Sequence, residues 1–83
     1  MSNSKKKHNI YNVIGKNIKK YRKLQGLTQR ELAESLLLSD SFIAKLESIT
    51  SQTLSIDTLE LFANKLDAPI TAFFDESVMN EKK

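Results

Sequence analysis

The segment from residue 39 to residue 48 concentrates polar groups at helical spacing. Positions three, four and seven residues apart share one stripe of a helix, and here they are Ser41, Ala44, Lys45 and Ser48. Asp40 lies at the leading edge of this stripe. The stripe offers a cationic donor, hydroxyl groups, a methyl group and a carboxylate, which are groups that hydrogen-bond and pack.

The sequence shows no residue arrangement typical of a catalytic site. It has one histidine, His8, in a polar stretch, no cysteine, and no glycine-rich phosphate loop. No pair of carboxylates is confined by the spacing of core residues. We therefore expect a protein that is not an enzyme, that has no cofactor and no metal site, and that shows no evident small-molecule ligand.

Length and composition predict one domain in the cytoplasm. A chain of 83 residues with 40% hydrophobic and 28% charged residues has room for a single modest core. The absence of cysteine suits a reducing compartment. No apolar run approaches the roughly 18 residues of a membrane span, so we expect no membrane contact.

Charge is distributed unevenly along the chain. The sequence from Lys5 to Arg30 is rich in lysine and arginine and contains no acid, and the acids begin at Glu31. The net charge of +3 favours a polyanionic partner without requiring one.

The hydrophobic periodicity predicts an all-α fold of five short helices. The first runs from residue 10 to 25 and ends before Gly26, and the second begins at a capping box, Thr28 to Glu31, and ends near residue 36. The third spans 39–48, the fourth 56–67, and the fifth, after Pro69, ends near residue 75. Residues 1–9 are expected to be a flexible basic arm and residues 76–83 a polar tail that frays.

The second and third predicted helices form a compact unit. Their inward positions are apolar: Leu32, Ala33, Leu36, Leu38, Ile43 and Leu46. The small side chain of Ala33 permits close approach where the two helices cross. Two such helices joined by a tight turn are a helix-turn-helix, whose second helix fits the major groove of DNA, about 12 Å wide.

Residues 14–74 resemble the Xre/Cro–C1 family, the lambda repressor-like helix-turn-helix domains of phage repressors and small bacterial regulators. The motifs that carry the resemblance are Ile14-Gly15-Lys16-Asn17-Ile18 with Arg22, Gly26-Leu27-Thr28-Gln29 with Glu31-Leu32-Ala33, Ser39 with Ile43, Leu46 and Glu47, and Asp57-Thr58-Leu59. The loop from Ser48 to Ser55 is similar to that of the SinR-type branch. The resemblance implies a domain over residues 10–75 that binds double-stranded DNA and regulates transcription, with repression as the expected sign.

The predicted geometry assigns two sets of DNA contacts. The expected base-reading residues are Asp40, Ser41, Ala44 and Lys45. The expected phosphate contacts are Thr28, Gln29, Ser39, Ser48, Lys16, Asn17 and Lys20. Asp40 has a second interpretation as a first-turn cap, and the run Lys5 to Lys7 is either a DNA-seeking arm or a solubilising tail.

The resemblance also implies an ion pair, and at two positions this sequence departs from the pattern of the family. Arg22 and Glu47 match positions that pair between the first and third helices of several family members, and we interpret the pair as structural. Leu37 stands at a turn position that is usually glycine, where a positive φ costs a residue with a β-carbon about 1 kcal/mol. Ile49 replaces another common glycine, after the third helix.

Dimerisation is expected because one such module buries only about 600–1,000 Å² against DNA. The expected interface comprises Ile70, Phe73, Phe74, Val78 and Met79. The alternative is that both phenylalanines are internal.

A second function remains open at this point. The same fold can serve as a protein-interaction module, antitoxin-like or binding a partner regulator, and Asp40 and Ile49 near the reading face favour that alternative. A DNA reader requires that removing charge at Lys45 or Lys20 weakens duplex binding and its salt dependence.

Overall fold

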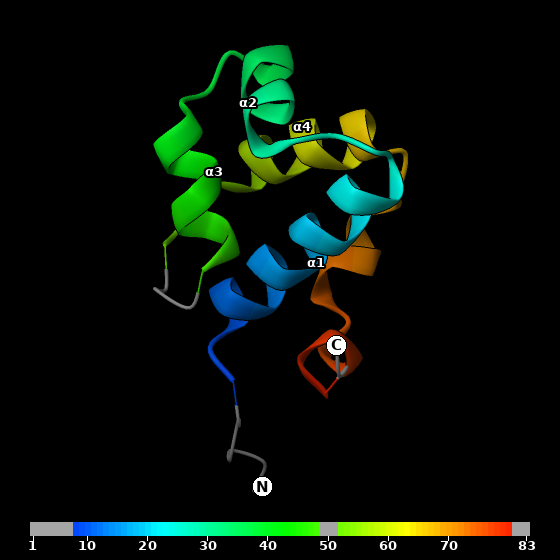
Figure 1. Ribbon diagram of the computed structural model, residues 1–83. Coiled ribbons are helices and arrows are strands. Elements are labelled where there is room, and N and C mark those ends of the chain that lie inside the picture. Colours follow the sequence, from blue (N-terminus) through cyan, green and yellow to red (C-terminus); the bar gives the residue numbers. More distant parts are fainter. Residues whose placement is uncertain (1–7, 49–51, 81–83) are drawn as a thin grey trace, which may run out of the picture.

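The structure, a computed structural model, describes residues 8–48 and 52–80, and every regular element in them is helical. Its elements are α1 (Ile10–Leu24), α2 (Gln29–Leu36), α3 (Asp40–Glu47), α4 (Ile56–Leu66) and two 3-10 helices, η2 (Ile70–Phe74) and η3 (Glu76–Asn80). In Figure 1, α1 crosses the middle of the molecule, α2 and α4 lie above it, and α3 forms one side. The all-α expectation is confirmed over the described residues.

The fifth helix expected from the sequence is not an α-helix. Residues Ile70–Phe74 form the 3-10 helix η2, and its cap position, Pro69, makes no side-chain capping hydrogen bond. Five residues, two of them β-branched, without a cap are too short to sustain an α-helix, and 3-10 geometry is common in pieces of this length. Over residues 8–48 and 52–80, the fold therefore has four α-helices followed by two short 3-10 helices.

Each α-helix begins at a side chain that accepts a hydrogen bond from its first turn. These caps are Asn9, Thr28, Ser39 and Ser55, which accept from the backbone N–H groups of Tyr11, Glu31, Phe42 and Thr58. Such caps satisfy backbone donors that have no partner inside the helix. The sequence predicts the caps Thr28 and Ser39 from their local signals, whereas it places the starts of the first and fourth helices from apolar spacing alone and does not single out Asn9 or Ser55.

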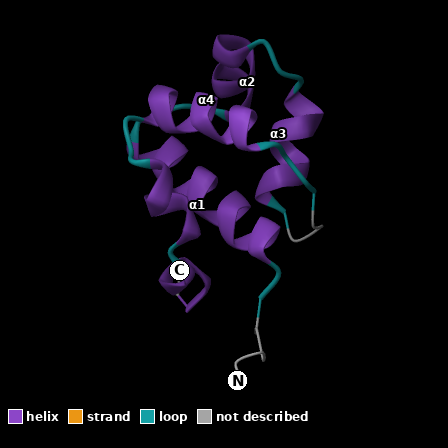
Figure 2. Cartoon of the chain, turned by 180° about the vertical axis from the view of Figure 1, so that it is seen from behind, coloured by secondary structure: helices purple, strands orange, loops and turns teal. Residues whose placement is uncertain are grey.

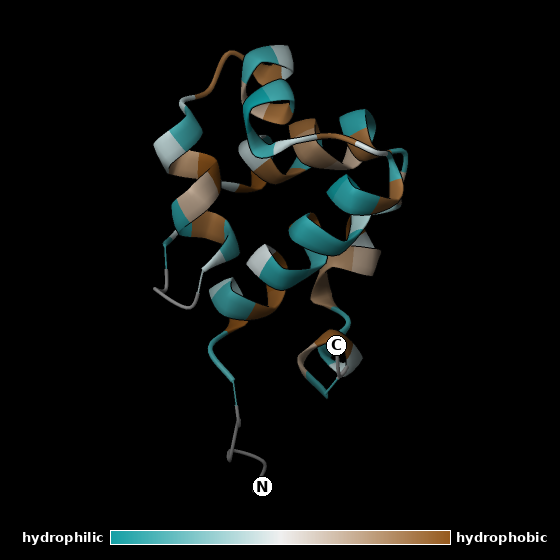
Figure 3. Ribbon diagram, viewed as in Figure 1, coloured by the Kyte–Doolittle hydropathy of each residue, from teal (hydrophilic) through white to brown (hydrophobic). Residues whose placement is uncertain are grey.

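The core lies where the helices meet. Its fully buried large side chains include Ile18, Leu32, Ile43, Leu46, Leu59, Phe62, Leu66 and Phe73. The ring of Tyr21 meets Phe73 edge to face, with ring centroids 5.7 Å apart. In Figure 3, the connection between α2 and α3 is also hydrophobic in colour, although it runs over the surface.

The sequence sets the end of the folded part at residue 75, whereas the structure continues with η3, in which Val78 is buried. Both 3-10 helices pack on α1, and the C-terminal end of the described chain lies beside that helix in Figures 1 and 2. Asp75 starts η3 by accepting from the backbone N–H of Ser77 at 3.0 Å. That bond, together with the Ser77 hydroxyl and the charge of Lys20, holds the pKa of Asp75 below its ordinary value.

Two sequence expectations fall largely outside the described residues. The N-terminal arm is described only at His8 and Asn9, and Asn9 is the cap of α1. Ile49 lies outside the described ranges. Within those ranges, no helix has both the length and the apolar character to cross a bilayer.

Candidate nucleic-acid interface

The N-terminus of α2 is fixed by a reciprocal capping box. The Thr28 hydroxyl accepts from the Glu31 N–H at 3.0 Å, and the Glu31 carboxylate accepts from the Thr28 N–H at 2.9 Å. Two backbone donors of the first turn are thereby satisfied. The capping box thereby fixes where α2 begins.

The turn between α2 and α3 is strained at Leu37. This residue has φ 59° and ψ 38°, in the left-handed region, and its side chain is 93% exposed. The N–H of Leu38 donates to the Ala33 carbonyl at 2.8 Å and closes the turn. Since Leu37 gains no packing from this position, the conformation costs about 1 kcal/mol relative to glycine.

α3 has one anchored face and one exposed face. Ile43 and Leu46 are buried in the core. The expected contact residues of the helix and its caps are all exposed, and they are Ser39, Asp40, Ser41, Ala44, Lys45 and Ser48. α3 lies at the edge of the molecule in Figure 1, with no described element covering its outer side.

An ion pair ties the end of α3 to α1. Arg22 donates to both carboxylate oxygens of Glu47, from Nε at 2.7 Å and from Nη2 at 2.9 Å, and its Nη1 donates to the Leu27 carbonyl at 2.6 Å. The two charged side chains are only 9% and 3% exposed. The bidentate geometry and the additional acceptor satisfy most of the donors of the buried guanidinium.

Gln29 joins the same network. Its amide Nε2 donates to Glu47 Oε1 at 3.0 Å, which links the start of α2 to the end of α3. An amide nitrogen carries two hydrogens, so this bond leaves one donor while fixing the side chain. The sequence singles out Gln29 for phosphate contact but gives no sign of its bond to Glu47.

Gly15 sets the distance between α1 and α3. A β-carbon at this position would overlap the backbone carbonyl of Leu46. The closest approach of the two helices therefore requires glycine. The sequence gives one signal for this, because glycine inside a helix is unfavourable by about 1 kcal/mol unless packing demands it.

The expected phosphate contact of Asn17 does not agree with the structure. Its side chain is 1% exposed, and its Nδ2 donates to the carbonyls of Val13, Phe73 and Asp75 at 3.1, 3.0 and 3.0 Å. Asn17 instead fastens the C-terminal elements to α1. The helical spacing hides this role, because the carbonyls come from a segment more than fifty residues away.

The expected dimer residues divide into two groups. Phe73 and Val78 are buried within the single chain, so they are not available to a second copy. Ile70 and Met79 are partly buried, and Phe74 is 39% exposed. The predicted interface is therefore wrong at Phe73 and Val78, because both side chains pack in the core of the single chain.

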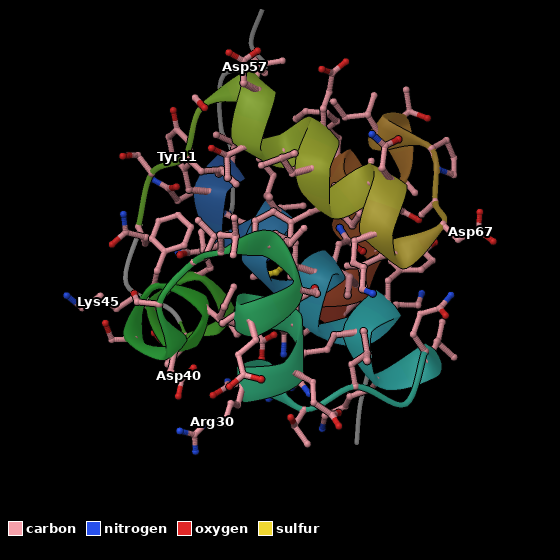
Figure 4. The ribbon with its side chains drawn as sticks, turned by 90° about the horizontal axis from the view of Figure 1, so that it is seen from above. Tyr11, Arg30, Asp40, Lys45, Asp57 and Asp67 are labelled. Atoms are coloured by element: carbon pink, nitrogen blue, oxygen red, sulfur yellow. The ribbon has the colours of Figure 1, made fainter. Side chains whose placement is uncertain are left out.

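Arg30, which is not among the predicted contact residues, lies beside Asp40. Its Nε is 4.0 Å from Asp40 Oδ2 and 3.4 Å from Glu34 Oε2. Figure 4 shows Arg30, Asp40 and Lys45 on one side of the molecule, away from the ends of α4 that are marked by Asp57 and Asp67. The described residues hold no group of three metal-binding side chains.

A tight turn between two short helices, with the second helix anchored on one side and exposed on the other, defines a helix-turn-helix protein. The helix-turn-helix family HTH_3, which is Xre/Cro-like, matches residues 18–73, and the chain belongs to this family.

One similar solved structure is the crystal structure of SinR, the master regulator for biofilm formation, in complex with DNA. It is 34% identical with a TM-score of 0.69, and the match covers 75% of this chain and 98% of that one. A comparison with curated proteins finds no significant match.

Proposed function

We propose that this chain regulates transcription by binding specific sequences in double-stranded DNA, with α3 inserted in the major groove. The observation that carries the proposal is the division of α3 into a buried face, with Ile43 and Leu46, and a wholly exposed polar face. A helix that displays side chains at the surface of a rigid domain fits a groove about 12 Å wide. The SinR structure, which holds DNA, supports this use of the fold.

The exposed face of α3 carries the base-reading chemistry. Lys45 donates to guanine O6 or N7, Ala44 meets a thymine methyl group, and Ser41 pairs with several base edges. Asp40 accepts from the amine of cytosine. These contacts give the domain its sequence preference.

Phosphate contacts orient the domain on the duplex. The residues proposed for them are Thr28, Gln29, Ser39, Ser48, Lys16 and Lys20. The start of α2 suits a phosphate oxygen, because backbone N–H groups and the positive end of the helix dipole lie there. The remaining amide hydrogen of Gln29, whose other donor is held by Glu47, adds a fixed donor.

We further propose that two copies bind together and that the effect on transcription is repression. A symmetric dimer reads two half-sites about one helical turn apart, which raises specificity above that of one module. Ile70, Phe74 and Met79 supply the apolar surface for this contact. A small domain that covers a promoter blocks access to it.

The salt dependence of duplex binding tests the proposal. The logarithm of the affinity falls linearly with the logarithm of salt concentration, and each neutralised phosphate contributes about 0.9 to the slope. We expect Lys45→Ala to weaken binding to a selected duplex. Lys65→Ala, which removes the same charge from the exposed side of α4, is the matched control and should bind like the unchanged protein.

One observation favours the second function, protein interaction on the same fold. Leu37 presents an apolar side chain, 93% exposed, beside the start of α3. Two results would support protein interaction over DNA recognition. One is the absence of duplex binding, and the other is an affinity that is the same for all sequences and for both lysine variants.

A further inference from the structure

Arg30 and Asp40 bring opposite charges from two helices to one point of the candidate interface. Arg30 is the second residue of α2, and Asp40 is the first residue of α3. Arg30 Nε lies 4.0 Å from Asp40 Oδ2, and the two side chains are 75% and 59% exposed. Figure 4 shows both side chains pointing outward on the side that also carries Lys45.

The order of groups along a G·C pair in the major groove matches this arrangement. Guanine presents two acceptors, N7 and O6, and cytosine then presents one donor, the N4 amine. A guanidinium offers paired donors that suit O6 and N7, and a carboxylate offers an acceptor that suits N4. An arginine and an aspartate side by side therefore complement the whole edge of one G·C pair.

We propose that Arg30 and Asp40 together read a single G·C base pair in each bound site. Arg30 donates to guanine, and Asp40 accepts from the cytosine of the same pair. This assignment rests on the proposed function, and it adds to it a residue of α2 that determines specificity. It also commits the site to one base pair in one orientation.

The same pair of side chains rejects the other base pairs. With A·T, the adenine amine faces the guanidinium, donor against donor, and thymine O4 faces the carboxylate, acceptor against acceptor. Reversing G·C exchanges the positions of donors and acceptors. Each wrong base pair leaves polar groups without hydrogen-bond partners in a desolvated interface, which makes the free energy of binding much less favourable.

Arg30 also makes a carboxylate tolerable at this position. An acid close to DNA phosphates is repelled, and the guanidinium compensates that charge at short range. Glu34 lies one turn further along α2, and its Oε2 is 3.4 Å from Arg30 Nε in a pair whose side chains are 75% and 69% exposed. An exposed pair of this kind contributes little, and Glu34 is given no base contact, so it serves as a control.

The test is selection of bound duplexes from random DNA by the full chain and three variants. The unchanged chain should return a motif that contains a G·C pair of fixed orientation. Asp40→Asn and Arg30→Lys should each reduce discrimination at that position by about 5- to 100-fold, the typical effect of one base pair, and should leave the other positions unchanged. Arg30→Lys keeps the charge but loses the paired donors.

Glu34→Gln is the matched control. Like Asp40→Asn, it replaces a carboxylate beside Arg30 with a neutral amide. It should keep the G·C preference. Two results would overturn the pairing. One is a selected motif with no G·C position, and the other is that the Asp40→Asn and Glu34→Gln variants change affinity equally for all sequences. Failure of the unchanged chain to select any duplex would instead overturn the proposed function on which the pairing depends.

Discussion

The carboxylate of Glu47 accepts hydrogen bonds from Arg22 and Gln29, so one buried side chain connects three helices. A buried charge of this kind is stable only while its partners remain. The network fixes the end of α3 relative to the start of α2. The position of the exposed stripe thus depends on residues that are not themselves exposed.

Removal of one partner should show this dependence. Arg22→Met should lower the free energy of unfolding by about 3 kcal/mol or more, because Glu47 would remain buried without its counter-charge. Chemical denaturation measures the change. Glu34→Gln, which breaks the exposed pair with Arg30, should change stability by less than about 0.5 kcal/mol. A similar loss in both variants would contradict the structural role of the buried pair.

The unit formed by α2, the turn and α3 combines well-capped helices with a strained connection. Leu37 and Asp67 both end helices in the left-handed region, with φ 59° and 55°. Aspartate tolerates this conformation better than leucine, because its short polar side chain bonds locally. The turn that orients α3 is thus stabilised by the helices on either side of it, because Leu37 itself is strained.

Leu37→Gly should therefore stabilise the protein. The expected gain is about 1 kcal/mol, since glycine adopts a positive φ without steric strain and the exposed leucine loses no packing. Thermal unfolding should show a higher midpoint. Asp67→Gly should gain less, and a loss of stability in Leu37→Gly would show that the leucine side chain has a contact that compensates for its backbone.

The sequence predicts the elements better than the contacts between them. The starts of α2 and α3 follow from Thr28 and Ser39, because capping involves residues three apart. The role of Asn17 and the bond between Gln29 and Glu47 depend on how distant segments pack, and no local pattern encodes them. The same holds for η2, where the apolar spacing of Ile70 and Phe74 suits an α-helix but a short, uncapped segment does not sustain one.

The C-terminal elements η2 and η3 mainly complete the core of the single chain. Asn17 holds the carbonyls of η2 and its end, and Phe73 fills the centre of the domain. Of the residues expected at the dimer interface, Ile70, Phe74 and Met79 keep exposed apolar surface. We therefore expect a dimer contact at this place to be small in the free protein and to form when DNA aligns the two copies.

Phe74→Glu should weaken that contact without unfolding the domain, because Phe74 is 39% exposed. Sedimentation in the presence of a two-half-site duplex should show two copies of the unchanged chain and one copy of the variant. Leu24→Glu, at a 70% exposed apolar position at the end of α1, is the control and should bind as two copies. Equal stoichiometry in all three proteins would remove Phe74 from the interface.

If the exposed face of α3 enters the major groove, the substitution Ala44→Glu should abolish tight duplex binding. This change places bulk and negative charge in the middle of that face while leaving the core residues untouched. Asn64→Glu introduces the same negative charge on the exposed side of α4 and is the control. We expect Ala44→Glu to lose affinity for the selected duplex by at least roughly 100-fold, as befits a change at the centre of a DNA interface, and Asn64→Glu to change it little. A folded Ala44→Glu protein that binds the duplex as tightly as the unchanged chain would show that α3 does not enter the groove.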